Sequence, residues 1–345
     1  MRIEPELDQS RLLELLRDRY PPDVAHLTFV PFGLDSWSYV AMCRDGSKAF
    51  VKLSRRGPAA NPTPSEVPLM AALAARQVAV PRPMADRDGD FLNAVDGYEV
   101  QVLEYLEGRS LEAETVWPDD IYAQVAATVA AVHASTNDVR HLVQRAERYE
   151  LPFLPPLVES LAAIETGGAL PANDDPTLAK LRVMVMPRSG ELRVAIGRFQ
   201  ELRDSASARD SEEVLCHTDI WGSNLLLSDD GTLHLLDWNG AILGPPEHDL
   251  FMFAGTEFFP ADRFGWFLDR YEEAVGHLRL DAETFGFYFY RRNFEDMASF
   301  VESIAGGQME AMGPDATLGV VADLLAEAPR LESRISQVAE VLSAR

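Results

Sequence analysis

Apolar and polar residues follow one another along this chain in two patterns. Short apolar runs typical of β-strands predominate near the N-terminus, and helical spacing predominates after it. Leucines three and four positions apart among charged residues predict a helix over residues 6–19, which Pro21-Pro22 ends. A second helix is predicted over residues 66–76. Short apolar runs bounded by turn residues predict strands at residues 26–32, 38–43, 49–53 and 98–103.

After Gly108 the apolar positions recur at helical spacing. They predict helices over residues 121–136, 191–204 and 288–304, and at least one more within residues 318–342. Residues 167–189 contain glycines, prolines and a pair of aspartates, so we expect a mobile insertion there. The chain therefore begins with a β-rich part and continues as a mainly helical one.

Within the helical part, two leucine-rich runs on either side of Asp229-Asp230-Gly231 predict a β-hairpin. If Asp230-Gly231 is a two-residue turn, counting outward places Asn224 directly opposite Asp237. Cross-strand partners have Cβ atoms about 4.5–5.5 Å apart. Carboxylate and amide oxygens at one end of a hairpin suit a hard cation such as Mg²⁺. Asp219 lies in the loop that leads to this end, and together the three residues indicate a phosphoryl-transfer site.

Composition narrows the class of protein. The 345 residues are 47% hydrophobic, which supports a sizeable core, and their formal net charge is −24. This charge argues against nucleic acid as a partner and would attract a cationic small molecule, although high solubility is a simpler explanation of it. No apolar run reaches the ~18 residues that span a bilayer, so we expect no membrane partner. The N-terminus lacks a signal-peptide core and there are two cysteines, which predicts a cytoplasmic location.

The spacing His217-x-Asp219-(x)4-Asn224, followed by Asp237-Trp238, resembles the catalytic and metal loops of the aminoglycoside phosphotransferase family, which is related to protein kinases. Residues 237–253 are most similar to the spectinomycin phosphotransferase branch. The resemblance implies an α+β, two-lobed protein-kinase-like fold. A small antiparallel β-sheet lobe over residues 1–104 would bind nucleotide, and a larger, mainly helical lobe over residues 105–345 would carry catalysis and substrate binding.

The same resemblance implies roles for the residues of the motif. Asp219 would orient the acceptor hydroxyl and take its proton, and His217 would pack behind it. Asn224 and Asp237 would hold Mg²⁺. Thr218 departs from the pattern, because many members of the family have glycine at this position.

A lysine inside an apolar strand, Lys52, needs a partner, because burying its charge unpaired is costly. The resemblance implies that Glu66 pairs with Lys52, which then binds the phosphates of ATP or another nucleoside triphosphate. The alternative is a surface lysine and an acidic residue that the helix dipole favours.

Four further residues would contact the nucleotide in such a fold. Ser36 lies in the loop between the first two strands, which would close over the phosphates, although a plain hairpin turn explains it equally. Backbone groups of Glu104 and Leu106 would bind the adenine edge, unless they are an ordinary strand end. Leu226 would lie under the adenine ring, although core packing is the default for any such leucine.

The acceptor is the least defined part of the site. Tyr290–Asp296 resembles a segment of the spectinomycin-type branch, and its Glu295-Asp296 pair would bind an amine-bearing acceptor; salt bridges to Arg291 or Arg292 on a solvated face are the alternative. We expect an O-phosphotransferase for an aminoglycoside or aminocyclitol antibiotic. Other small-molecule kinases of this fold, acting on a sugar, choline, homoserine or a macrolide, remain alternatives. A regulatory pseudokinase is disfavoured, because the four polar residues expected to act in phosphoryl transfer are all present: Lys52, Asp219, Asn224 and Asp237. Oligomeric state is left open.

Overall fold

The computed structural model describes residues 3–21, 23–31, 36–55, 66–112, 116–168, 175–255, 259, 261–307, 309 and 313–345. The chain forms two compact units. Unit 1 consists of Met1–Ala146, Val214–Leu243 and Glu273–Val275; unit 2 consists of Glu147–Glu213, Gly244–Glu272 and Gly276–Arg345. The lobe boundary expected at residue 104 stays a prediction, since unit 1 contains both the N-terminal sheet and the segment of the predicted hairpin. Among the described residues, no helix is long and apolar enough to cross a membrane.

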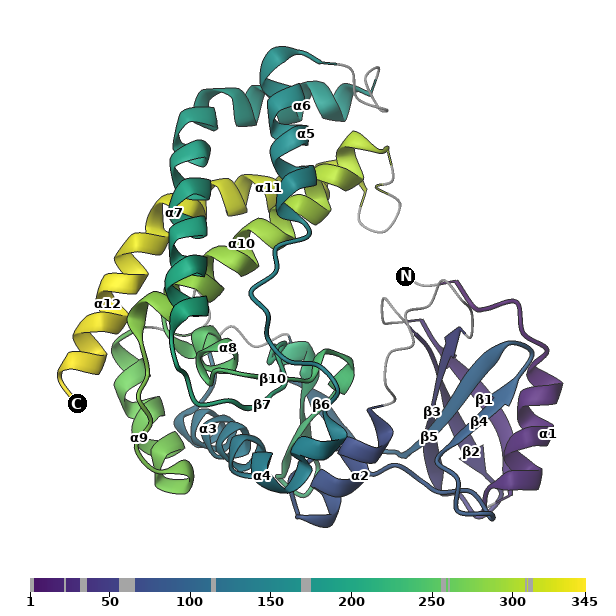
Figure 1. Ribbon diagram of the computed structural model, residues 1–345. Helices are drawn as coiled ribbons and strands as arrows, with labels where there is room; N and C mark the ends of the chain where they lie inside the picture. The colour runs from purple at the N-terminus through teal and green to yellow at the C-terminus, as the bar shows by residue number, and fades with distance from the viewer. Residues whose placement is uncertain are drawn as a thin grey trace. The chain divides into compact units, whose positions relative to one another are not determined.

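Unit 1 begins with a five-stranded antiparallel sheet in the order β1-β2-β3-β5-β4 (Figure 1). Its strands are β1 Val24–Val30, β2 Trp37–Cys43, β3 Lys48–Arg55, β4 Leu92–Val95 and β5 Tyr98–Glu104. Helix α1, Gln9–Arg19, buries Leu12 and Leu16 in the same core as Tyr39, Val51 and Val100. The predicted first helix and the four predicted strands are confirmed, and only the short β4 was not foreseen.

Lys52 lies in β3, which pairs with β2 on one side and β5 on the other. Its neighbours Val51 and Leu53 are fully buried in the core, so strand alternation turns Lys52 to the opposite face of the sheet. Helix α2, Val67–Ala75, follows in the chain with Glu66 at its N-cap position. The loop before Glu66 lies outside the described residues.

The remainder of unit 1 holds the segment in which the sequence predicts the catalytic residues. A three-stranded sheet in the order β6-β8-β9 and a two-stranded sheet of β7 and β10 are packed by helix α3. The elements are α3 Asp119–Ala134, α4 Thr136–Val139, β6 Gly108–Ser110, β7 Val214–Cys216, β8 Leu225–Ser228, β9 Leu233–Leu235 and β10 Ile242–Gly244. The predicted hairpin is thus present as β8 and β9, and the helix predicted over residues 121–136 is present as α3.

The register of this hairpin differs from the prediction by one residue. Leu226 pairs with His234. The Leu236 N–H donates to the Asn224 carbonyl at 2.8 Å, so Asn224 faces Leu236 and not Asp237. The two oxygen ligands expected opposite each other are therefore offset along the hairpin.

The turn explains the offset. The Asp230 carboxylate accepts hydrogen bonds from the Thr232 N–H at 2.9 Å and the Ser228 hydroxyl at 2.6 Å. Gly231 takes a φ of +86°, a conformation open to glycine. The loop is consequently a three-residue one closed by a left-handed glycine, in place of the expected two-residue turn.

Unit 2 is helical. Its helices are α5 Leu154–Thr166, α6 Pro176–Val185, α7 Ser189–Ala208, α8 Glu247–Leu250, α10 Ala282–Ala305, α11 Pro314–Glu327 and α12 Leu331–Ser343, with most of α9 Phe264–Val275. Helix α10 packs against α5, α7, α11 and α12 (Figure 1). Phe199 of α7 stacks on Phe287 and Phe294 of α10, with ring centroids 5.6 Å apart in each pair. The predicted helices of this part are confirmed, with longer bounds.

The prediction of a mobile insertion over residues 167–189 is wrong for the part that the structure describes. Pro176–Val185 forms helix α6, which buries Leu178 and Leu181. The Asp175 carboxylate caps it by accepting the Thr177 N–H at 2.7 Å. An N-cap aspartate followed by proline at the first helical position is a helix start, and this signal outweighs the loop-like composition.

Glu247, at the start of α8, is a buried acid that links stability to pH. Its Oε1 accepts the N–H of Asp281, the N-cap residue of α10, at 2.8 Å. Burial raises the pKa of Glu247 from 4.5 to about 7. Because the pKa in the folded state lies above the unfolded value, this proton stabilises the fold fully below pH 4.5, and the stabilisation is lost as the pH rises through 7.

We expect Glu247→Gln to be more stable than the wild type at pH 8 and about equally stable at pH 5. Glutamine keeps an oxygen for the Asp281 N–H but never carries a charge, so the gain at pH 8 should be roughly 1–3 kcal/mol. Urea denaturation at the two pH values measures it. Glu340→Gln, at an exposed position of α12, is the matched control. An equal gain at both pH values would contradict the assignment.

Candidate active site

Asp219 and Asn224 orient each other at the end of β8. The Asn224 side chain donates through Nδ2 to the Asp219 carbonyl at 2.8 Å and to Asp219 Oδ2 at 2.9 Å. Both amide hydrogens of Asn224 are thereby directed to Asp219, so the amide oxygen is the atom that Asn224 has left to coordinate a cation. The sequence spacing that suggested these two residues thus corresponds to a direct contact.

His217 lies behind Asp219 and is fully buried. Its Nε2 donates to the Leu236 carbonyl at 2.8 Å, and its Nδ1 accepts the Asp219 N–H at 3.3 Å. The ring also packs edge-on against Trp238, with centroids 4.9 Å apart. These contacts join the catalytic loop to the strand that leads to Asp237, which fits the supporting role expected for His217.

Two non-glycine residues of this site have a left-handed backbone, Thr218 with φ 77° and Asp237 with φ 59°. A β-branched residue such as threonine is strained in this conformation. The Thr218 hydroxyl donates to the Gly240 carbonyl at 3.3 Å, and a Cβ on Gly240 would collide with that hydroxyl. The catalytic loop and the segment after Asp237 therefore fit closely, and position 240 requires glycine.

Lys52 reaches this segment from the N-terminal sheet. Its Nζ lies 3.0 Å from Asp237 Oδ1, 3.4 Å from Asn239 Oδ1 and 3.9 Å from Glu66 Oε1. The Lys52 and Glu66 side chains are 13% and 15% exposed, whereas that of Asp237 is 51% exposed. The expected Lys52–Glu66 pair is present at the long limit of an ion pair, and the shorter contact is the one to Asp237.

The other residues expected around the nucleotide lie in the same unit. Ser36 is buried, but the loop residues before it are outside the described part of the chain. The Glu104 N–H donates to the Arg82 carbonyl at 2.9 Å, so its backbone donor is already used. Leu106 lies in the connection between β5 and β6, and Leu226 is half-buried in β8. Their contacts with nucleotide stay predictions.

Sequence reasoning missed two residues next to this site. The Asn239 side chain contacts Lys52, and the Arg145 guanidinium donates through Nη2 to the backbone carbonyls of Asn239 and Ala241. Asn239 directly follows Asp237-Trp238, and its residue type alone does not indicate a contact with Lys52. Arg145 lies in an irregular segment far away in sequence, where no periodicity or motif marks it.

A family model described as the phosphotransferase enzyme family matches residues 28–288 of the chain. The match covers the sheet with Lys52, the catalytic loop and the hairpin. The chain belongs to the phosphotransferase enzyme family. It is a small-molecule kinase, an ATP-dependent phosphotransferase, and both the predicted family and the predicted α+β kinase-like fold are confirmed.

Individual relatives of this phosphotransferase are distant. Protein StrN of Streptomyces griseus is 25% identical over 252 residues, which are 68% of this chain and 72% of StrN. Spectinomycin phosphotransferase in complex with ADP and spectinomycin has a TM-score of 0.74 at 16% identity, covering 95% of this chain and 99% of its own. Amicoumacin kinase in complex with AMP-PNP, Ca²⁺ and Ami has a TM-score of 0.64 at 16% identity, covering 93% of each chain. These two structures share the fold.

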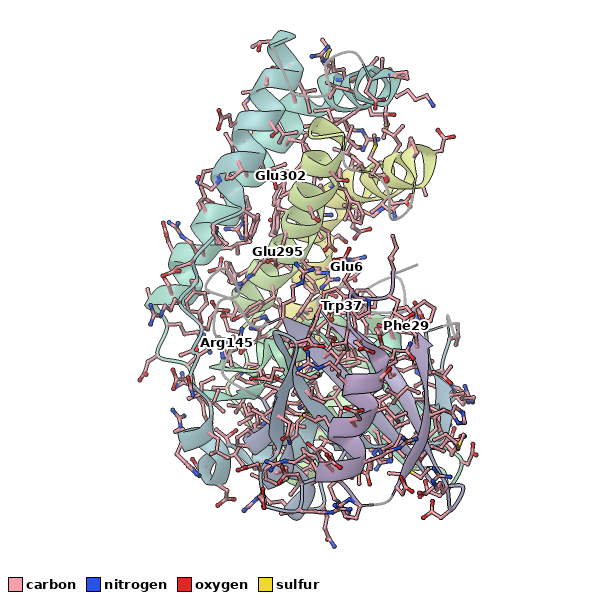
Figure 2. The ribbon with its side chains drawn as sticks, turned by 90° about the vertical axis from the view of Figure 1, so that its right-hand side faces the viewer. Glu6, Phe29, Trp37, Arg145, Glu295 and Glu302 are labelled. Carbon is pink, nitrogen blue, oxygen red and sulfur yellow. The ribbon has the colours of Figure 1, made fainter. Side chains whose placement is uncertain are left out.

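In this phosphotransferase, Glu295 and Asp296 lie on helix α10, and Figure 2 shows Glu295 on its surface. Arg291 Nε is 3.8 Å from Glu295, and Arg292 Nε is 2.8 Å from Asp296. The intrahelical ion pairs considered as the alternative are therefore present. Arg291 makes a shorter contact, at 2.7 Å, with Glu147, which leaves Glu295 loosely held and 53% exposed. Acceptor binding by this pair stays a prediction.

Glu147 is a buried carboxylate in a cluster that joins α8 to α10. Its Oε2 lies 2.7 Å from Arg291, 3.2 Å from the Tyr288 hydroxyl and 3.4 Å from His248 Nδ1. Burial alone would raise the pKa of Glu147, but the Arg291 guanidinium holds it below its usual range. Burial lowers the pKa of His248 to about 4, so the imidazole is uncharged at neutral pH. The cluster fixes Arg291 in place.

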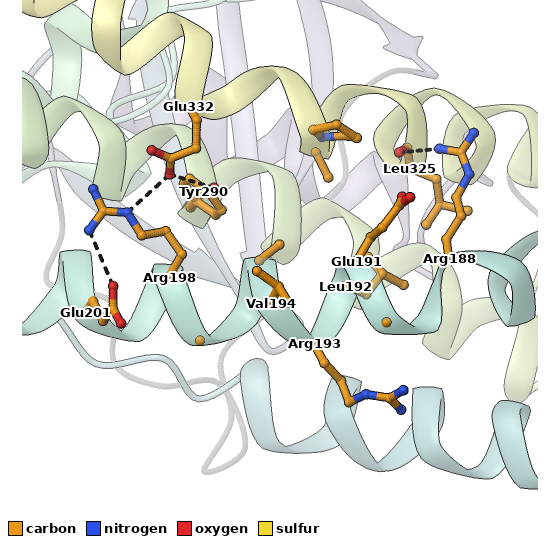
Figure 3. A pocket seen from close by; sticks show the side chains of 15 residues that line it. Arg188, Glu191, Leu192, Arg193, Val194, Arg198, Glu201, Tyr290, Leu325 and Glu332 are labelled. Atoms are coloured by element: carbon orange, nitrogen blue, oxygen red, sulfur yellow. Dashed lines mark hydrogen bonds and ion pairs between the residues drawn. The ribbon is translucent and has the colours of Figure 1, made fainter.

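A cavity of about 750 Å³ lies within unit 2, lined by α7, α10 and the turn between α11 and α12 (Figure 3). It contains none of the predicted site residues. Three of its charged groups bind the protein itself: Glu332 accepts from Arg198 at 3.2 Å and from the Tyr290 hydroxyl at 2.9 Å, and Arg188 donates to the Leu325 carbonyl at 2.6 Å. The cavity is a groove between packed helices, and the predicted catalytic and metal-binding residues Asp219, Asn224 and Asp237 lie in unit 1.

Proposed function

We propose that this enzyme transfers the γ-phosphoryl group of ATP, or of another nucleoside triphosphate, to a hydroxyl of a cationic small molecule, most favourably an aminoglycoside or aminocyclitol antibiotic. One observation supports the site. The Asn224–Asp219 contact and the Lys52–Asp237 contact lie next to each other, because Leu236, the residue before Asp237, pairs with Asn224. Together these residues supply a proton acceptor (Asp219), two oxygen ligands for a metal ion (Asn224 and Asp237) and a positively charged side chain (Lys52). A cytoplasmic role in antibiotic resistance is part of the same proposal.

In this proposal Asp219 acts on the acceptor. Its carboxylate orients the hydroxyl and takes the proton as the new oxygen–phosphorus bond forms. The bond between the γ-phosphorus and its bridging oxygen breaks, and its electron pair leaves with the nucleoside diphosphate. Lys52, with Glu66 beside it, neutralises phosphate charge. Because the protein does little covalent chemistry, positioning and electrostatics account for most of the rate.

The Asn224 amide oxygen and the Asp237 carboxylate would hold Mg²⁺. The donor set fits a hard cation, because both are oxygens: the Asn224 amide hydrogens point to Asp219, and the Asp237 carboxylate is half-exposed. When bound, such an ion supplies charge neutralisation at the phosphates. Ser36, the backbone of Glu104 and Leu106, and the side chain of Leu226 would surround the rest of the nucleotide.

The test is nucleotide consumption with Mg²⁺ across a panel of acceptors. The panel contains spectinomycin and other aminocyclitols, aminoglycosides, a macrolide, choline, homoserine and neutral sugars. We expect turnover with an amine-bearing aminocyclitol or aminoglycoside, and mass spectrometry should show one phosphate added to it. Turnover confined to a neutral sugar or to homoserine would overturn the acceptor class. Absence of turnover with every member, despite nucleotide binding, would favour a regulatory role.

For Glu295 and Asp296 we expect a KM effect specific to the acceptor. If they bind its ammonium groups, Glu295→Ala and Asp296→Ala should raise the KM of an amine-bearing acceptor by roughly fivefold to tenfold, since hydrogen bonds to charged groups contribute about 1.5–3 kcal/mol and exposure weakens them. The KM for ATP should stay unchanged. Glu332→Ala in the groove of Figure 3 is the control. If both constants stay unchanged in both variants, this helix does not bind the acceptor.

A further inference from the structure

The segment around Asp237, residues 235–241, is held by Trp238 from within it, by His217 and Thr218 of the preceding loop, and by Arg145. It forms a single 3-10 turn, Trp238–Gly240, and then enters β10. Five of its backbone carbonyls accept hydrogen bonds from side chains. The acceptors and their donors are Leu235 with the Trp238 indole, Leu236 with His217, Asn239 and Ala241 with Arg145, and Gly240 with Thr218. The left-handed conformation of Asp237 therefore depends on contacts that lie around it, since such a conformation is unfavourable for a non-glycine residue.

Among these donors, Arg145 is the charged one, and both its backbone and its side chain are attached to the segment. The Leu243 N–H donates to the Arg145 carbonyl at 2.9 Å, and Ala146 forms a parallel bridge with Leu243. The Arg145 guanidinium donates forward to the Asn239 and Ala241 carbonyls. Arg145 thus contacts both ends of residues 239–243, and it is exposed to solvent; Figure 2 labels its side chain.

Asn239 connects this contact to the nucleotide residues. Its carbonyl accepts from Arg145, while its side-chain oxygen lies 3.4 Å from Lys52 Nζ. Lys52 in turn lies 3.0 Å from Asp237. A chain of direct contacts therefore runs from Arg145 through Asn239 to the proposed phosphate-binding lysine and the proposed metal ligand.

We propose that Arg145 is a positioning residue for nucleotide binding: by holding the Asn239 carbonyl, it sets the place of the Asn239 side chain and hence of Lys52 relative to Asp237. The inference rests on the proposed function, because it assigns Lys52 and Asp237 to the nucleotide. Arg145 acts through Asn239 and does not itself contact the phosphates. A shift of about 1 Å at such a site is enough to lower activity markedly.

The experiment measures the affinity for ATP with Mg²⁺ by calorimetry, together with the steady-state constants. Arg145→Met should weaken ATP binding by roughly tenfold, the lower end of what a charged hydrogen-bond donor contributes. Arg145→Lys should restore most of the loss, because an ammonium can still donate to a carbonyl. The KM for the acceptor should not change. Arg148→Met, an exposed arginine three residues on, is the control for the loss of a surface charge.

The decisive comparison is with Asn239→Ala. The double variant carries both Arg145→Met and Asn239→Ala. If Arg145 acts through Asn239, the affinity of the double variant for ATP should be no lower than that of the single variant with the lower affinity. Additive losses, or wild-type affinity in Arg145→Met, would overturn the inference. If the wild type binds ATP but phosphorylates no member of the acceptor panel, the proposed acceptor class is wrong. The ATP affinities of the Arg145 and Asn239 variants would still decide the role of Arg145. A wild type that binds no nucleotide would overturn both.

Discussion

Asp219→Ala should lower turnover by about 10²–10⁴, the usual contribution of a positioned proton acceptor, while the affinity for ATP stays within a fewfold of the wild type. The reason lies in the geometry: Asp219 is held by Asn224 and by His217, so its carboxylate is oriented before any substrate arrives. Steady-state turnover and ATP calorimetry on the same preparation separate the two effects.

Asp219→Asn is the sharper variant. It preserves shape and leaves an oxygen for the Asn224 amide, but it has no basic oxygen for the acceptor proton. It should therefore be as inactive as the alanine variant and unfold at the same temperature as the wild type. Turnover near the wild-type value in either variant, with the true acceptor, would exclude Asp219 as the proton acceptor.

Lys52→Ala should lower turnover by about 10²–10³ and raise the KM for ATP, in line with the removal of one preorganised electrostatic contact. The coupling energy between Lys52 and each of its two acidic neighbours should be larger for the shorter distance. Lys52 lies 3.0 Å from Asp237 and 3.9 Å from Glu66, so a double-mutant cycle should give a larger coupling for Lys52 with Asp237 than with Glu66.

Lys180→Ala is the control, since Lys180 is an exposed lysine of α6 paired with Asp315. It should leave all constants unchanged. Strictly additive effects of Lys52→Ala and Glu66→Ala would mean that the two side chains do not act together during catalysis. The pairing inferred from the resemblance to protein kinases would then be wrong.

The sequence predicted most of the elements of this fold because their signals are local. Alternating apolar residues are enough to define strands such as β3, and an amphipathic pattern is enough to define α10. The error over α6 came from giving composition more weight than the capping signal at Asp175. The hairpin was found, but its register depended on the hydrogen bonds of one aspartate in the turn, which counting residues does not reveal.

In the candidate site, too, the residues with a local sequence signal were predicted and a residue without one was missed. Asp219 and Asn224 were found because their spacing is short and fixed by one loop, and they are in direct contact. Arg145 was not found, because its contact with Asn239 joins residues 94 positions apart and is made to a backbone carbonyl, whose position does not depend on residue type. Contacts of this kind have no sequence pattern, so only the folded chain reveals them.

The way the chain leaves unit 1 has a consequence for the length of the segment that follows. Residues 147–213, with α5, α6 and α7, form an excursion that departs after Ala146 and returns at β7. Ala146 bridges to Leu243 of β10, and β7 pairs with β10, so both ends are anchored on one strand. Doubling the length of an excursion between fixed ends costs only about 0.6 kcal/mol of closure entropy. A change in the length of this stretch would therefore add little closure entropy, and its main cost would lie in the contacts that α5 and α7 make with α10.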